Sequence, residues 1–286
     1  MIGTQRLPLK SRSDYSTVTE TPGTRVTSEA FKMLHSRYAY AAEFCQGKDV
    51  LEVACGAGQG LGYLARRTRH IVGGDYTHAL LDLAHQHYRG RVPLVCLDAH
   101  SLPFRDQSFE VVLLFEAIYY LADPENFLQE CRRVMRPTGV LLVCSANKEW
   151  YGFNPSPFSK RYFSAGELKW LLDSSGFNPQ IYGAFPAAES TGSRRVIASV
   201  RKLAVRWNLI PKTMKGKEAL KRLFYGQLVA LGPEIDEHLA QPAPLYPIST
   251  TEAVTGYKIL YVIGRLKESG RVSQSHCATG SAPAMA

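Results

Sequence analysis

The chain has 286 residues, of which 45% are hydrophobic and 21% charged, as is ordinary for a globular protein with one large core. Its 34 Lys and Arg exceed its 25 Asp and Glu and give a formal net charge of +9, which favours an acidic partner: nucleic acid, an acidic small molecule or a lipid surface. The longest apolar run, Val111 to Phe115, is far too short to span a bilayer.

The start of the chain and the cysteines indicate a compartment. Residues 1–24 are polar, contain Pro8, Pro22 and Gly23, and lack the apolar stretch of a signal peptide, so we predict a flexible arm. The six cysteines form no C-x-x-C pair, which favours reduced thiols and predicts no metal site. Together these features predict a cytoplasmic protein.

Strands and helices alternate along the next part of the chain. A helix is predicted from about Glu29 to Phe44, capped by Thr27 or Ser28. Five apolar strands follow, with helices between them; the strands are predicted at 49–54, 71–74, 93–97, 110–115 and 140–145. The intervening helices are predicted at 60–67, 77–88 and 124–135. This alternation predicts parallel strands with right-handed crossovers, and therefore a doubly wound three-layer α/β sheet.

The last third of the chain interrupts this rhythm with a basic segment. After a helix at 164–174, two further strands are predicted at 179–185 and 257–265, which makes the sheet seven-stranded and mostly parallel. Residues 25–186 and 251–267 would form the domain, residues 187–250 a helical insertion, and residues 268–286 a disordered tail.

The insertion accounts for the basic character of the protein. Residues 190–232 hold ten Lys or Arg and one acid, and residues 194–210 have an amphipathic helical pattern. The segment would cap the site and favour an acidic acceptor, and its part from 194 to 222 could contact a membrane surface. Equally, it could be an amphipathic pair with solvated charges, packed on the sheet.

A glycine-rich loop follows the first strand of the sheet. Gly56, Gly58 and Gly60 let the backbone turn sharply and approach a ligand closely, and the next helix offers unpaired N–H groups. The loop lacks the third glycine of a dinucleotide-binding motif, whose position is taken by Leu61. Glu52, just before the loop, suits a cationic ligand. The loop therefore favours S-adenosylmethionine, which carries a sulfonium and an amino group, over NAD.

An acid also ends the second strand. A carboxylate at Asp75 can accept two ribose hydroxyls, as in other open α/β sheets that hold adenosine. The alternative is that Asp75 only caps the helix that begins near Thr77. The glycine loop at the matching distance favours the ligand.

Four segments between residues 47 and 176 together resemble the class I S-adenosylmethionine-dependent methyltransferases, in particular the type 11 subgroup that methylates small molecules, lipids and sugars. The segments are VLEVACGAGQG (50–60), VGGDYTHALLDLA (72–84), CLDAHSLPFRDQSFEVVLLFEAIYYLADPENFLQECRRVMRPTGVLLV (96–143) and YFSAGELKWLLDSSGF (162–177). The resemblance implies that S-adenosyl-L-methionine is the cofactor. The residues it assigns to the cofactor are Glu52, Gly56, Ala57, Gly58, Gly60, Asp75, Tyr76, Asp98, Ala99 and Phe115. Among these, Asp75 would hold the ribose and Asp98 the adenine.

Candidates for the chemistry follow the strand ends. Glu116, His100 and Tyr119 are the candidate catalytic residues, since a hydroxyl acceptor can require a base. Candidate substrate contacts are Tyr38, Tyr120, Asn147 and Tyr151. Tyr38 could equally be a helix residue packed on the sheet, and at least one of Tyr119 and Tyr120 a core residue.

These observations predict an O-methyltransferase acting on a small molecule, a sugar or a lipid-linked glycan that bears acidic groups. The alternative is N- or C-methylation of a lipid-like or aromatic metabolite. An RNA methyltransferase is disfavoured, because no RNA-binding module accompanies the domain. A non-catalytic cofactor-binding protein is also disfavoured, because the acids at Glu52, Asp75 and Asp98 are all present.

Overall fold

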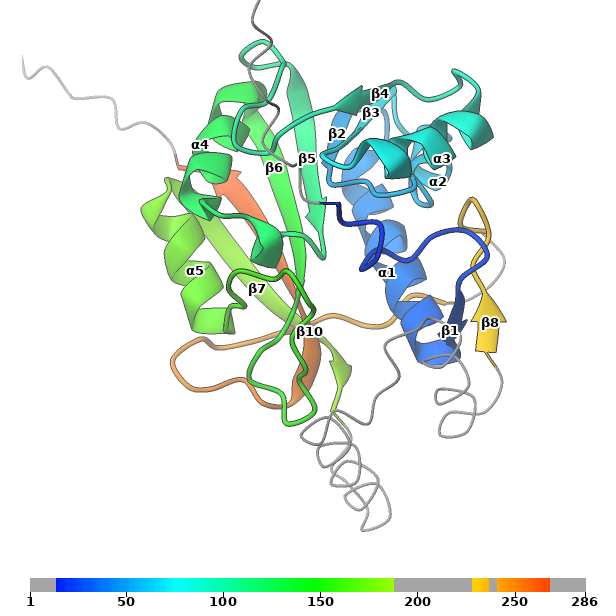
Figure 1. Cartoon of the computed structure of the whole chain (residues 1–286). Coiled ribbons are helices and arrows are strands. Elements are labelled where there is room, and N and C mark those ends of the chain that lie inside the picture. Colours follow the sequence, from blue (N-terminus) through cyan, green and yellow to red (C-terminus); the bar gives the residue numbers. More distant parts are fainter. Residues whose placement is uncertain (1–13, 188–227, 237–240, 268–286) are drawn as a thin grey trace, which may run out of the picture.

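The computed structural model describes residues 14–187, 228–236 and 241–267. Within these ranges an eight-stranded sheet has the strand order β4-β3-β2-β5-β6-β10-β7-β9 (Figure 1). Its strands are β2 (Asp49–Val53), β3 (His70–Asp75), β4 (Leu94–Cys96), β5 (Phe109–Phe115), β6 (Met135–Ala146), β7 (Phe177–Pro186), β9 (Tyr246–Pro247) and β10 (Tyr257–Leu266).

The sheet is mostly parallel, as predicted. Strands β2 to β6 pair in parallel, and β10 lies antiparallel between β6 and β7. Seven strands match the predicted ones, and the two-residue β9 adds an edge next to β7. The carboxyl ends of the parallel strands therefore meet along one edge of the sheet, where ligands bind in open α/β folds.

Helices cover both faces of the sheet (Figure 1). Helices α1 (Ser28–Cys45), α2 (Leu61–Ala65) and α3 (His78–Tyr88) lie on one face, and α4 (Pro124–Val134) and α5 (Ala165–Ser174) lie on the other. Side chains of β5 alternate between the two faces: Val111 and Leu113 pack in the first core, and Val112 and Leu114 in the second. Both cores are apolar, so the three-layer fold predicted from the strand pattern is confirmed.

Local sequence explains where the helices begin. The Thr27 side chain accepts a hydrogen bond from the N–H of Ala30 and caps α1. A capping box between Ser164 and Glu167 starts α5. One predicted boundary is wrong: Met135 begins β6 and does not end α4, because it already pairs with Phe109 across the sheet.

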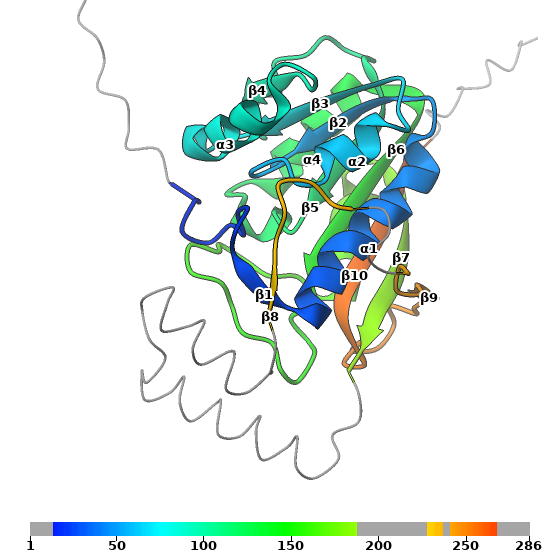
Figure 2. The ribbon, with the colours of Figure 1, turned by 90° about the vertical axis from the view of Figure 1, so that its right-hand side faces the viewer.

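A short strand before α1 and a short strand from the later part of the chain lie side by side. Strand β1 (Arg25–Thr27) pairs antiparallel with β8 (Leu228–Ala230) at one end of α1 (Figure 2). Residues 14–24, the described part of the predicted flexible arm, lie against the domain, where the N–H of Tyr15 donates to Thr77 Oγ1 at 3.4 Å. The amphipathic pattern at 194–210, the basic stretch 194–222 and the tail 268–286 lie outside the described residues. None of the helices in the described ranges has the length and apolar character needed to cross a membrane.

Candidate active site

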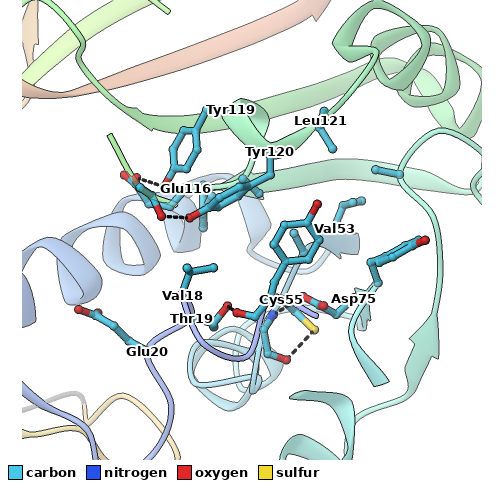
Figure 3. A pocket seen from close by; sticks show the side chains of 18 of the residues that line it. Val18, Thr19, Glu20, Val53, Cys55, Asp75, Glu116, Tyr119, Tyr120 and Leu121 are labelled. Atoms are coloured by element: carbon cyan, nitrogen blue, oxygen red, sulfur yellow. Dashed lines mark hydrogen bonds between the residues drawn. The ribbon is translucent and has the colours of Figure 1, made fainter. Parts of the chain in front are cut away.

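A pocket of about 700 Å³ lies at the carboxyl ends of the parallel strands. Its lining comes from residues 15–20, from α1, from the ends of β2, β3 and β5, and from the 3₁₀ helix η1 (Ile118–Tyr120). Figure 3 shows Glu116, Tyr119 and Tyr120 on one side of it, with Thr19 and Asp75 on the other. The pocket therefore brings together several of the residues predicted for a cofactor, among them Gly56, Asp75 and Asp98, with the predicted catalytic residues Glu116 and Tyr119.

The glycine loop is bound to its neighbours mainly through its backbone. Gly56 and Gly58 have φ values of +59° and +78°, which favour glycine. The N–H of Gly56 donates to Asp75 Oδ2 at 2.8 Å, and the carbonyl of Gly58 accepts from the Tyr88 hydroxyl at 2.6 Å. A Cβ at Gly60 would lie 1.9 Å from the Tyr38 ring, so only glycine fits there.

Only some of the predicted loop residues reach the pocket. Gly56 lines it, whereas Ala57, Gly58 and Gly60 are not among the lining residues. These three are buried, and their small size lets neighbouring side chains pack against the loop. Their predicted contact with a cofactor is therefore not supported by the lining of the pocket.

Asp75 has a ligand-facing position and a structural role at once. It ends β3, is 6% exposed and lines the pocket. Its Oδ1 accepts from the N–H of Thr77 at 2.8 Å, while Oδ2 holds Gly56. Burial raises the pKa of this carboxyl, and the N–H donors oppose that rise. Since a carboxylate has about four acceptor positions, Asp75 can hold the N–H groups of Gly56 and Thr77 and still accept ribose hydroxyls.

Asp98 and Ala99 also line the pocket, beside Tyr76. Asp98 Oδ1 accepts from the backbone N–H of His100 at 2.9 Å and lies 2.7 Å from its Nδ1. The His100 Nε2 accepts from the N–H of Asp123 at 3.2 Å, so the proton is assigned to Nδ1. Both ring nitrogens are therefore engaged, and the geometry does not support His100 as a base.

Glu52 lies behind the pocket and not in its wall. It is 1% exposed, and its Oε1 accepts from the Tyr38 hydroxyl at 2.6 Å. Its Oε2 is buried without a hydrogen-bond partner, and burial raises the pKa of the carboxyl to about 7. Tyr38 lines the pocket and packs edge-on against Phe115, another lining residue. The expected direct contact of Glu52 with a cationic ligand is therefore not made through the pocket surface.

Glu116, one of the predicted catalytic residues, lines the pocket directly after β5. Its φ of +52° is a strained value for a non-glycine residue, of the kind that clusters at functional sites. Its Oε2 accepts from the Tyr119 hydroxyl at 2.9 Å, and its Oε1 lies 3.6 Å from Cys144 Sγ. Burial raises the pKa of Tyr119 well above its usual range, and Glu116 adds to this. Tyr119 is thus a hydrogen-bond donor to Glu116 and a poor base itself.

Three aromatic side chains line the same part of the pocket. Tyr119 is 6% exposed and stacks on Tyr162 at 4.2 Å between ring centroids. The Tyr120 hydroxyl lies 2.6 Å from Ser156 Oγ, and its ring lies 5.2 Å from that of Tyr15. Tyr119 is therefore the more buried of the pair, while Tyr120 keeps the predicted place of a substrate contact.

The two substrate contacts predicted from the loop after β6, Asn147 and Tyr151, do not line the pocket. Asn147 is fully buried, where its side-chain amide donates to the carbonyls of Val254 and Tyr257 and its Oδ1 accepts from the N–H of Glu149. It fixes that loop to the start of β10. Tyr151 is 48% exposed, and neither it nor Asn147 is among the residues that line the pocket.

Several lining residues were not predicted from the sequence, and three of them carry polar groups of interest: Gln59, Arg37 and Tyr15. Gln59 is 8% exposed, and its Nε2 has no hydrogen-bond partner. Arg37 lines the pocket with only its Nε bonded, to the carbonyl of Met33 at 3.3 Å. Burial alone would lower the pKa of Arg37, but the charge of Glu116 raises it, so the guanidinium stays charged. Tyr15 is the third, and nothing in its sequence context places it here.

The chemistry of these groups fits a zwitterionic nucleoside. Asp75 offers acceptors for a ribose, and the missed pair Arg37 and Gln59 offers donors for an anionic group. Across residues 14–187, 228–236 and 241–267, no group of three His, Cys, Asp or Glu side chains is placed to hold a metal ion.

Comparison with known proteins agrees with this chemistry. Residues 51–143 match the family model described as methyltransferase domain. A protein of Mycolicibacterium smegmatis, named as a probable S-adenosylmethionine-dependent methyltransferase, is 36% identical over 165 residues, which cover 54% of this chain and 62% of that protein. A phthiotriol/phenolphthiotriol dimycocerosates methyltransferase of Mycobacterium ulcerans is 44% identical over 100 residues, which cover 34% of this chain and 36% of that protein. The chain thus spans less than two thirds of the length of these curated relatives.

Solved structures share the fold. The YcgJ protein of Bacillus subtilis is similar with a TM-score of 0.53 and 17% identity, covering 85% of this chain and 100% of that one. The [4+2]-cyclase SpnF is similar with a TM-score of 0.54 and 19% identity, covering 87% of this chain and 88% of that one. At such identities the likeness concerns the fold alone.

Proposed function

We propose that the protein, whose residues 51–143 match a family model described as methyltransferase domain, transfers a methyl group from S-adenosylmethionine to a hydroxyl group of an acceptor. The observation that carries the proposal is one pocket that joins Asp75, at the end of β3, to Glu116, at the end of β5. The Asp75 carboxylate can accept hydrogen bonds from the ribose of an adenosine, and the Glu116 carboxylate can accept the proton of an acceptor hydroxyl.

One side of the pocket would hold the donor. Asp75 would accept from the ribose hydroxyls, while Leu97, Asp98 and Ala99 line the adjoining surface, where an adenine would lie. The S-adenosylmethionine carboxylate is its one anionic group, and Arg37 with Gln59 supplies matching donors. When bound, S-adenosylmethionine supplies an electrophilic methyl group on its sulfonium.

The residues of the other side would orient the acceptor and take its proton. Methyl transfer is an in-line displacement, so positioning supplies much of the rate. Glu116 would accept the proton of the acceptor hydroxyl, and the Tyr119 hydroxyl, 2.9 Å from Glu116 Oε2, would hold that carboxylate in place. Because Tyr119 binds Oε2, the opposite oxygen is the one for the acceptor, beside Cys144.

The walls favour an acceptor with an apolar or aromatic body. Tyr15 and Tyr120 lie on the acceptor side, and Val18, Met33 and Ile259 also line the pocket. We therefore favour a small molecule or the lipid part of a glycan conjugate over a bare sugar. An acidic group on the acceptor, and contact of 194–222 with a membrane surface, remain proposals that rest on the charge of the sequence alone.

The aromatic wall also supports the second candidate, N- or C-methylation of a lipid-like or aromatic metabolite. Stacking against tyrosine rings orients flat ligands whatever atom receives the methyl group. Two relatives named for such acceptors are the phthiotriol/phenolphthiotriol dimycocerosates methyltransferase and the demethylmenaquinone methyltransferase of Clavibacter sepedonicus, which is 32% identical over 100 residues, or 34% of this chain and 41% of that protein.

Two measurements test the proposal. Calorimetry should detect binding of S-adenosylmethionine and of its demethylated product, S-adenosylhomocysteine. Transfer from a methyl-labelled donor to a panel of phenols, long-chain alcohols and glycolipids should then yield an acid-stable, base-stable ether. Absence of donor binding by the purified full chain contradicts the proposal, and a labelled amine or carbon product replaces the O-methyl assignment with the second candidate.

A further inference from the structure

Two segments that lie far apart in sequence meet beside the glycine loop. Strand β1 pairs with β8, and this pairing extends beyond the strands: the N–H of Gly23 donates to the carbonyl of Leu231 at 2.8 Å, and the N–H of Leu231 donates to that of Thr24 at 2.9 Å. We call residues 14–27 and 228–236 together the clasp. Figure 2 shows β1 and β8 crossing the helical face beside α1.

The carboxylate of Glu234, in the clasp, binds one side chain of α3 and two side chains that lie just after α2 and α3. Glu234 Oε1 lies 2.7 Å from His87 Nε2 and 3.0 Å from Arg91 Nη2, and its Oε2 lies 3.1 Å from Arg66 Nη1. The Glu234 side chain is 19% exposed and lies over Gly62, where a Cβ would come within 2.2 Å of its Oε2. The Glu234 carboxylate is thus held by three side chains and packs on a glycine, where a larger residue would displace it.

The clasp touches the pocket-lining part of the loop from two directions. The N–H of Ile235, next to Glu234, donates to the carbonyl of Gln59 at 2.9 Å, and Ile235 is 4% exposed in the core. From the other segment, Thr19 Cγ2 lies 3.1 Å from the place of a Cβ on Gly56. Gln59 and Gly56 both line the pocket, and the Gln59 side-chain amide nitrogen is buried without a partner.

We propose that Glu234 is a positioning residue for the donor site, which acts by holding Ile235 against Gln59. The inference rests on the proposed function. The ion pairs of Glu234 fix the backbone of 234–235, that backbone fixes the carbonyl of Gln59, and the Gln59 amide is thereby aimed into the pocket. Because coupling is reciprocal, a bound donor also stabilises the clasp.

Calorimetry with S-adenosylhomocysteine on the full chain tests this coupling. Glu234→Gln keeps the size of the side chain but removes its charge, and we expect the affinity to fall about fivefold or more. Glu110→Gln is the matched control. It removes ion pairs with Arg69 and Arg136 near the amino end of β5, whereas the pocket lies at the carboxyl end. This control should bind within about twofold of the wild type.

Hydrogen exchange separates positioning from general weakening. In the wild type, S-adenosylhomocysteine should slow exchange of the Leu231 and Ile235 amides, and Glu234→Gln should reduce that protection. Unchanged affinity in Glu234→Gln with faster Ile235 exchange would overturn the proposal, as would an equal loss of affinity in Glu110→Gln. Failure of the wild type to bind S-adenosylhomocysteine would instead overturn the proposed function itself.

Discussion

The two sides of the pocket are built in different ways. The donor side comes from the glycine loop and the ends of β3 and β4, which are consecutive elements within residues 50–100. The acceptor side comes from Tyr15, from Glu116 at the end of β5 and from η1, which converge from distant parts of the chain. The donor side is thus built largely by the parallel sheet, whereas the acceptor side depends more on segments laid over it.

This difference explains how one fold can serve many acceptors. Ends of parallel strands always meet at one edge, so a motif that follows a strand keeps its place when other segments change. The segments over that edge are free to vary in length and composition, and function changes with them. The solved neighbour described as a [4+2]-cyclase has the same fold under a different functional name.

The largest effect is expected on the acceptor side. Glu116→Gln keeps the hydrogen bond from Tyr119 but removes the proton acceptor, and should lower kcat about 10²- to 10³-fold. Affinity for S-adenosylhomocysteine should stay within about twofold, because Glu116 belongs to the other side. Steady-state kinetics and calorimetry measure the two effects separately. Glu20→Gln, another lining carboxylate, is the control.

An intact kcat in Glu116→Gln would contradict the role of Glu116 as base. An equal loss of donor affinity would show that the two sides are not independent, and the comparison between them would then fail.

The next largest effect is on the pH dependence of stability. It concerns Glu52, which lies behind the pocket lining and is covered by Tyr38. Its pKa is raised by burial from 4.5 to about 7, so the folded protein keeps this carboxyl protonated where the unfolded chain ionises it. Its contribution to stability is therefore fully present below pH 4.5 and is lost as the pH rises through 7. Glu52→Gln is neutral throughout, so its stability relative to the wild type should rise by about 3 kcal/mol between pH 4 and pH 8.

Urea unfolding of both proteins across this pH range measures the difference. A constant difference would show that Glu52 does not titrate as described. Since Tyr38 separates Glu52 from the pocket, affinity for S-adenosylhomocysteine should change little, and a large loss at pH 8 would place Glu52 in the donor site.

Asp75→Ala tests the donor side directly. The substitution removes the ribose acceptor and also the carboxylate that holds the N–H groups of Gly56 and Thr77. Affinity for S-adenosylhomocysteine should fall about 30-fold, or about 2 kcal/mol, as for loss of hydrogen bonds to a charged group. Asp82→Ala, on the exposed face of α3, should bind as the wild type does. Undiminished binding by Asp75→Ala would contradict the ribose assignment.

The sheet and much of the donor side could be predicted because they follow from local patterns. Apolar strands separated by helices predict a parallel, doubly wound sheet, and residues such as Asp75 and Asp98 lie at or just after the ends of strands. Glu52 does not line the pocket, because alternation along β2 decides which face a side chain takes and a sequence motif alone does not show what covers that face. Here Tyr38, from a different element, covers it.

The acceptor side was harder to predict because its residues are far apart in sequence. Tyr15 lies in a polar stretch that resembles a flexible arm, and contacts with distant residues, such as those with Thr77 and Tyr120, hold it on the domain. Asn147 was predicted as a contact because it follows a strand, but the carbonyls of β10 and its preceding loop satisfy it completely. Long-range pairing of this kind leaves no local pattern.

The smallest effect concerns Arg37, which lies where the two sides of the pocket meet. Two ligands that differ in the donor carboxylate can show which side it serves. If Arg37 binds the donor carboxylate, Arg37→Met should weaken S-adenosylhomocysteine about tenfold and leave methylthioadenosine, which lacks that carboxylate, unchanged. Arg132→Met, in α4 on the opposite face of the sheet, is the control. Equal losses for both ligands would mean that Arg37 only supports the fold of the pocket. Unchanged affinity for both, with a raised KM for the acceptor, would move Arg37 to the acceptor side and make it the anchor for an acidic group there.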